Sequence, residues 1–123
     1  MSLRIVLLED EPLIQEIIRA ALLTIDPSIR IESFENGDEA IARYREAAPY
    51  DLVITDNAHP GLFGIEFIEA VRALQENQPV ILQTGNTGQH IDEFERKWRD
   101  IPVFEKPWGG KQFLQAVKTL LTE

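Results

Sequence analysis

Polar side chains that could do chemistry stand where four short apolar runs of the sequence end. Glu9 and Asp10 follow the first run, Asp56 follows another, and Thr84 and Lys106 follow two more. If the runs are parallel strands of one sheet, their carboxyl ends meet at one edge, and these polar groups lie together there. Three carboxylates gathered in this way repel one another, and would either take up protons or recruit a cation.

Oxygen ligands alone favour Mg²⁺, which keeps part of its water shell and accepts a phosphoryl oxygen as a further ligand. Beside such a metal, the Asp56 carboxylate could act as a nucleophile toward phosphorus and form an aspartyl phosphate. Lys106 would neutralise charge on the phosphoryl group, and the Thr84 hydroxyl would donate a hydrogen bond to one of its oxygens. The residues therefore indicate Mg²⁺-dependent phosphoryl transfer to Asp56.

Each of these residues, taken singly, also has a purely structural explanation. Acids before a helix commonly cap it, and an Asp after a strand can hydrogen bond to the backbone of its own turn. Thr84 can simply close a strand, and Lys106 can be a solvated surface lysine. All of them nevertheless fall at the ends of predicted strands, and none is needed to bury a core. Their joint placement favours a functional site.

Five repeats of one pattern supply the elements that position these residues. Each repeat is a short apolar run followed by apolar residues at helical spacing, as in a strand that leads into a helix. The strands are predicted over residues 3–8, 29–34, 52–55, 79–83 and 102–105. The helices are predicted from five apolar faces: Ile14, Ile18, Leu22 and Ile25; Ala40, Ile41, Tyr44 and Ala48; Phe67, Ile68, Val71 and Leu74; Ile91, Phe94 and Trp98; and Phe113, Leu114, Val117, Leu120 and Leu121.

This alternation predicts the fold class. Strands separated by helices require right-handed crossovers, which give a parallel sheet covered on both faces. We therefore predict an α/β fold with a single doubly wound, five-stranded parallel sheet and five helices. No repeat, low-complexity tract or linker-like stretch divides the chain, so we expect one domain over residues 1–123 without an output domain.

Composition excludes several classes of function. The net charge of −9 disfavours nonspecific attraction to nucleic acid or to anionic lipid. The absence of cysteine excludes disulfides, thiolate zinc sites and cysteine nucleophiles, and fits a reducing cytosol. The apolar runs are too short to cross a bilayer, and the amino terminus lacks a signal-peptide pattern. We expect a cytoplasmic protein that neither enters membranes nor binds nucleic acid directly.

Taken together, the motifs resemble the receiver domain of a two-component response regulator over essentially the whole chain. That family has the flavodoxin-like strand order 2-1-3-4-5, and the resemblance implies a bacterial phosphorelay protein. The residues that carry the resemblance are Glu9-Asp10-Glu11-Pro12, Asp56 with Pro60 and Gly64 after it, Thr84-Gly85, and Lys106-Pro107.

The resemblance also implies a role for each residue. Asp56 would accept a phosphoryl group from a phosphohistidine on a histidine kinase or a phosphotransfer protein. Lys106 would pair with the phosphoryl group, and Thr84 would reorient toward it on activation. The implied Mg²⁺ ligands are Asp10 directly, Glu9 through water, the Asp56 carboxylate, and the backbone carbonyl of Ala58.

A domain of this kind is a signalling switch rather than a turnover enzyme, although it catalyses its own phosphoryl transfer and a slow self-dephosphorylation. Its output would pass to a downstream protein partner, and a homodimer through the face of the fourth and fifth helices is a further expectation. The chain could be a stand-alone regulator, or a receiver from a longer regulator or a hybrid kinase.

One departure from the family pattern and three rival functions bear on this interpretation. The family usually has an aromatic residue three positions before the lysine, where this chain has Val103, and Phe104 points to the other side of the strand. A phosphatase of the haloacid dehalogenase type needs a second aspartate at the position of Ala58, and a flavin or nucleotide binder lacks its phosphate loop here. A pseudo-receiver that docks partners without phosphorylation stays open.

Overall fold

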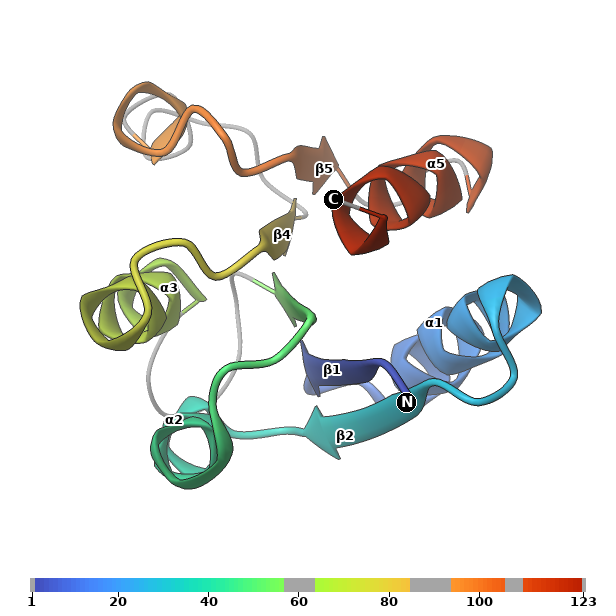
Figure 1. The fold of residues 1–123 in the computed structure, drawn as a ribbon, viewed down its shortest axis with the longest axis horizontal. Coiled ribbons are helices and arrows are strands. Elements are labelled where there is room, and N and C mark those ends of the chain that lie inside the picture. Colours follow the sequence, from blue (N-terminus) through green and yellow to red (C-terminus); the bar gives the residue numbers. More distant parts are fainter. Residues whose placement is uncertain (1, 57–63, 85–93, 106–109, 123) are drawn as a thin grey trace.

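A five-stranded parallel sheet lies between two layers of helices (Figure 1). The computed structural model describes residues 2–56, 64–84, 94–105 and 110–122. The strand order is β2-β1-β3-β4-β5, which confirms the predicted doubly wound, flavodoxin-like fold. The strands are β1 (Arg4–Leu8), β2 (Arg30–Phe34), β3 (Leu52–Asp56), β4 (Val80–Thr84) and β5 (Val103–Glu105).

The helices cover both faces of the sheet, with α1 and α5 on one side and α2 and α3 on the other (Figure 1). Pro12 opens α1, where its missing N–H is not needed, and the Asn36 side chain caps α2 by accepting the Asp38 N–H at 2.8 Å. The helices are α1 (Pro12–Ile25), α2 (Gly37–Ala47), α3 (Gly64–Leu74) and α5 (Gly110–Leu121), and residues 94–97 are also helical.

Side chains that alternate along each strand divide the core into two parts. Val6 and Leu8 of β1 pack with the layer of α2 and α3, whereas Ile5 and Leu7 pack with α1 and α5. Two of the three inner strands, β1 and β3, are largely apolar and buried on both faces, as is typical of a parallel sheet. This packing places the carboxyl ends of both strands at the same edge.

Among the described residues, the predicted helix faces are buried or partly buried, except for Leu74 of α3. Leu74 is wrong as a core residue, because its side chain is 46% exposed. Leu74 is the last residue of the helix, whereas the buried residues Val71 and Arg72 stand three and two positions before it. Phe94 and Phe113 are buried as predicted, and Ile91 lies outside the described residues.

An ion pair ties the segment before β5 to α3. The Arg72 guanidinium donates to both carboxylate oxygens of Asp100, at 2.8 and 3.4 Å, and its Nε donates to the Gln78 carbonyl oxygen at 2.9 Å. Beside this pair, the Arg72 guanidinium lies 5.4 Å from the centre of the Trp98 ring. The chain therefore enters β5 from a fixed position.

Substitution Asp100→Asn will cause a small loss of stability that depends on pH. The hydrogen bond from Arg72 holds the pKa of Asp100 below its usual value of 3.8, so the pair stabilises the fold above that pH and its contribution disappears as the pH falls below it. Because the Asp100 side chain is 68% exposed, we expect a loss below about 1 kcal/mol at pH 7.

Urea unfolding at pH 7 and pH 3 measures this difference. The exposed Glu95→Gln variant has the same charge change and serves as the control. An equal loss for Asp100→Asn at both pH values would show that the ion pair is not its cause.

Candidate functional site

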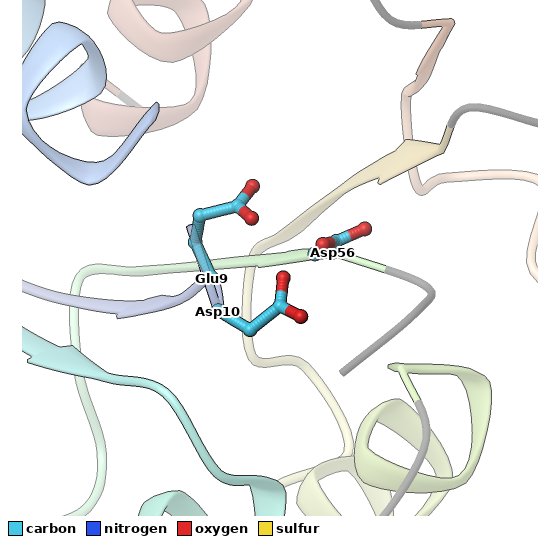
Figure 2. A group of neighbouring side chains, drawn as sticks. All are labelled: Glu9, Asp10 and Asp56. Atoms are coloured by element: carbon cyan, nitrogen blue, oxygen red, sulfur yellow. The ribbon is translucent and has the colours of Figure 1, made fainter. Parts of the chain in front are cut away.

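Three carboxylates meet at the carboxyl edge of the sheet (Figure 2). Glu9 and Asp10 directly follow β1, and Asp56 is the last residue of β3. Leu8 is paired with Thr55 in the register of these neighbouring strands, so the residues that follow them lie side by side. One oxygen from each carboxylate lies within 4.8 Å of the others. This confirms that the three predicted acids come together.

Burial strengthens the repulsion within this acidic cluster (Glu9, Asp10 and Asp56). Glu9 is fully buried, Asp56 is 5% exposed, and Asp10 is partly buried. Charges of one sign repel more strongly away from bulk water, because the surroundings screen them less. A set of carboxylate oxygens at this spacing suits a hard divalent cation, and Mg²⁺ keeps water ligands that can bridge to a more distant side chain. The cluster therefore fits the predicted metal.

Backbone hydrogen bonds hold Glu9 in place. Its N–H donates to the Phe34 carbonyl oxygen at 3.0 Å, and its own carbonyl oxygen accepts the side-chain amide of Gln15 at 2.6 Å. Its carboxylate accepts the Glu11 N–H at 3.2 Å. Glu11 is the N-cap residue of α1, and its own side chain makes no capping bond.

Asp56 lies beside the strand that carries Thr84. Asp56 is paired with Gln83 on β4, and the Thr55 hydroxyl donates to the Asp56 carbonyl oxygen at 2.9 Å. Thr84 is the next residue of β4; it is buried and is paired with Glu105, the last residue of β5. Thr84 thus reaches the predicted edge.

Two predicted site residues, Lys106 and Ala58, lie outside the described part of the chain, and their roles stay predictions. Val103 and Phe104 lie within it and take opposite faces of β5, as predicted. Val103 packs with the core under α2 and α3, and the Phe104 ring meets the Phe113 ring of α5 edge-on at 5.9 Å. Phe104 therefore does not replace the missing aromatic residue.

Gln15 and Thr55, whose side chains bond to the backbone of Glu9 and Asp56, were not predicted from the sequence. The sequence gives only a weak indication of the role of Gln15, which is that a polar amide stands in the first turns of a largely apolar helix. The sequence gives even less indication of a role for Thr55, because threonine is common inside strands for packing alone.

Comparison with known proteins decides the family. The family model for the response regulator receiver domain matches residues 5–118. This chain belongs to the response regulator receiver family. The receiver is 34% identical over 120 residues to the transcriptional regulatory protein ResD of Bacillus subtilis, covering 96% of this chain and 48% of ResD. It is 26% identical over 123 residues to the chemotaxis protein CheY of the same organism, covering 98% of this chain and 99% of CheY.

Solved structures of other proteins have the same fold as this chain. The chemotaxis protein CheY4 of Vibrio cholerae superposes with a TM-score of 0.83 at 21% identity, covering 98% of this chain and all of that one. A two-component transcriptional regulator from Clostridium phytofermentans gives a TM-score of 0.79 at 25% identity, covering 98% of this chain and 93% of that one. The receiver spans about half the length of ResD, and almost the full length of CheY.

Family membership gives the general role of the domain. Receiver domains are signalling switches of two-component systems, which bind a divalent metal in an acidic pocket and interact with histidine kinases or phosphotransfer proteins and with downstream effectors. The acidic cluster of this chain fits phosphorylation. Within the described residues, every helix is too short or too polar to cross a membrane.

Proposed function

We propose that this receiver accepts a phosphoryl group on Asp56 in a Mg²⁺-dependent reaction, and that this switches a protein-interaction surface. The observation that carries the proposal is the acidic cluster, whose three carboxylate oxygens lie within 4.8 Å of one another at the end of β3. The donor is a phosphohistidine on a histidine kinase or a phosphotransfer protein, and the output passes to a downstream protein in the cytoplasm.

The chemistry follows from the placement of Asp56. One of its carboxylate oxygens attacks phosphorus, an O–P bond forms, and the N–P bond to the donor histidine breaks. Asp10, Glu9 through water, and the Ala58 carbonyl would hold Mg²⁺ together with Asp56. The bound ion would neutralise the charge of the phosphoryl oxygens.

Two further side chains complete the proposed reaction. Thr84 is buried on the neighbouring strand end, from which its hydroxyl can donate to a phosphoryl oxygen after a rotation of its side chain. Lys106 follows Glu105 in the sequence and would supply a compensating positive charge. Water attack on the phosphoryl group would later restore the Asp56 carboxylate.

Phosphorylation adds about −1.5 to −2 charges beside buried acids, and such a local change can bias a surface with two arrangements. The added charge is the proposed signal. The expected homodimer would involve α5 and the region of residues 94–97, and it stays a prediction.

Intact-mass spectrometry after incubation with acetyl phosphate tests the proposal. With Mg²⁺, we expect a gain of one phosphoryl group that alkali or hydroxylamine removes, as for an acyl phosphate. With EDTA in place of Mg²⁺, we expect no gain, because the clustered carboxylates then repel the incoming anion. A protein that stays unmodified in Mg²⁺ would instead be a docking module that acts without phosphorylation.

A further inference from the structure

The side chain of Gln15 reaches back from α1 to the acidic cluster. Its Nε2 donates to the carbonyl oxygen of Glu9 at 2.6 Å, while its backbone N–H makes the ordinary helical bond to the Glu11 carbonyl oxygen at 3.0 Å. Gln15 is half-buried and belongs to the first turns of α1, which begins at Pro12. The residue thus joins the rigid helix to the backbone of a proposed metal ligand.

The hydrogen bond from Gln15 fixes a peptide plane that orients two of the acidic side chains. The Glu9 carbonyl belongs to the peptide plane between Glu9 and Asp10, so a rotation of that plane changes the direction of both carboxylates. The preceding peptide plane is held by the Glu9 N–H, which donates to the Phe34 carbonyl oxygen at 3.0 Å. The two peptide planes on either side of Glu9 are therefore anchored to β2 and to α1.

Glutamine has the chemistry that this position needs. The acceptor is a carbonyl oxygen, so the partner must be a donor, and a side-chain amide supplies one without bringing a positive charge next to a cation site. At 2.6 Å, the bond is slightly shorter than the usual range of about 2.7 to 3.2 Å for an N–H donor and an oxygen acceptor. Methionine would match the length of the side chain without donating, and glutamate would match its shape while offering only acceptors.

We infer that Gln15 is a positioning residue for the metal site: by fixing the peptide between Glu9 and Asp10, it preorganises both carboxylates for the cation. The inference rests on the proposed Mg²⁺ site and extends it to a residue that touches no ligand oxygen. Loss of a partner that orients a metal ligand typically weakens metal affinity by about 10- to 100-fold. Because Gln15 acts through the backbone, we expect about a tenfold increase in Kd.

Titration calorimetry with MgCl₂ tests this on the full chain. Gln15→Met is expected to raise the Kd for Mg²⁺ about tenfold. The matched control is Gln112→Met, which makes the same change at an exposed position of α5 and is expected to leave the Kd unchanged. The unfolding of each metal-free variant is measured in parallel, because a merely structural role would lower stability and leave the Kd of the folded protein where it was.

Gln15→Glu separates positioning from electrostatics. The new carboxylate adds negative charge beside the site, which by itself would tighten Mg²⁺ binding. It cannot donate to the Glu9 carbonyl oxygen, so loss of positioning predicts weaker binding instead. Amide spectra of the metal-free protein give a second readout, with shifts expected at residues 9–11 in both Gln15 variants.

The outcomes distinguish this inference from the proposed function. If the wild type binds Mg²⁺ and Gln15→Met has the same Kd, the positioning role is overturned and the metal site stands. The same conclusion follows if Gln15→Glu binds Mg²⁺ more tightly than the wild type. A wild-type protein that does not bind Mg²⁺ overturns both. Weaker binding in both Gln15 variants, with the Gln112→Met control unchanged, supports the inference.

Discussion

Asp56→Asn will abolish phosphoryl uptake from acetyl phosphate. The amide is nearly the same size as the carboxylate and fits the buried position at the end of β3, where Asp56 is 5% exposed. It lacks the anionic oxygen that attacks phosphorus, so no covalent intermediate can form on it. It also removes one of three mutually repelling carboxylates, so we expect the metal-free variant to be at least as stable as the wild type.

Two further variants show whether the loss is specific to Asp56. Asp10→Asn keeps the nucleophile and removes the proposed direct metal ligand, so uptake is expected to fall sharply and to recover partly at high Mg²⁺. Asp51→Asn changes a carboxylate that lies just before β3, at the opposite end of the strand, and should not affect uptake. Intact-mass spectrometry under the conditions used for the wild type measures all three.

A single phosphoryl group on Asp56→Asn would place the acceptor elsewhere. Fragmentation of the modified protein would then locate it, and Glu9 and Asp10 would be the first positions to inspect because they share the cluster. Uptake that also vanished in Asp51→Asn would indicate a general effect of charge rather than loss of a nucleophile.

The position of the acidic cluster could be predicted because it follows from topology. An apolar run that ends in polar residues gives a strand and its carboxyl end, and parallel strands bring those ends together whatever the details of packing. Glu9 and Asp56 therefore needed no distance information beyond the alternation of strands and helices. The opposite faces of Val103 and Phe104 could be predicted for a similar reason, because side chains alternate along a strand.

Several other features could not be predicted from local sequence patterns, and some of them depend on partners far away in the sequence. Arg72 has the pattern of an exposed helical arginine, yet it is buried against Asp100, which lies 28 residues later. Leu74 has the pattern of a core residue and lies at the exposed end of α3. The Ala48–Pro49 peptide is cis, and the residues around it give no distinctive signal for that isomer.

Gln78 is the strongest example of such a distant partner. It is 2% exposed, just before β4, and its side chain makes four hydrogen bonds. Its Oε1 accepts the Tyr44 hydroxyl at 2.6 Å and the Tyr50 N–H at 3.1 Å. Its Nε2 donates to the carbonyl oxygens of Tyr50 and Pro79, at 2.7 and 3.1 Å. One amide thus satisfies polar groups of three separate segments of the chain.

Gln78→Met will lower the free energy of unfolding by about 3 kcal/mol. Each buried polar group left without a partner costs about 1 to 3 kcal/mol, and the total is limited because some of these groups will form hydrogen bonds with water instead. Burial raises the pKa of Tyr44 to about 12, so its hydroxyl stays a donor and the loss should be the same from pH 6 to pH 9. Urea unfolding followed by circular dichroism measures it, with the exposed Gln75→Met as the matched control.

The same variant separates the stability of the fold from the chemistry of the site. Gln78 precedes β4, at the amino-terminal edge of the sheet, whereas the acidic cluster lies at the carboxyl edge. Well below its melting temperature, folded Gln78→Met should therefore bind Mg²⁺ with the wild-type Kd, in contrast to Gln15→Met. A loss of stability no larger than that of Gln75→Met would mean that water replaces the lost hydrogen bonds. A weakened Kd would mean that the two edges of the sheet are coupled through β3 and β4.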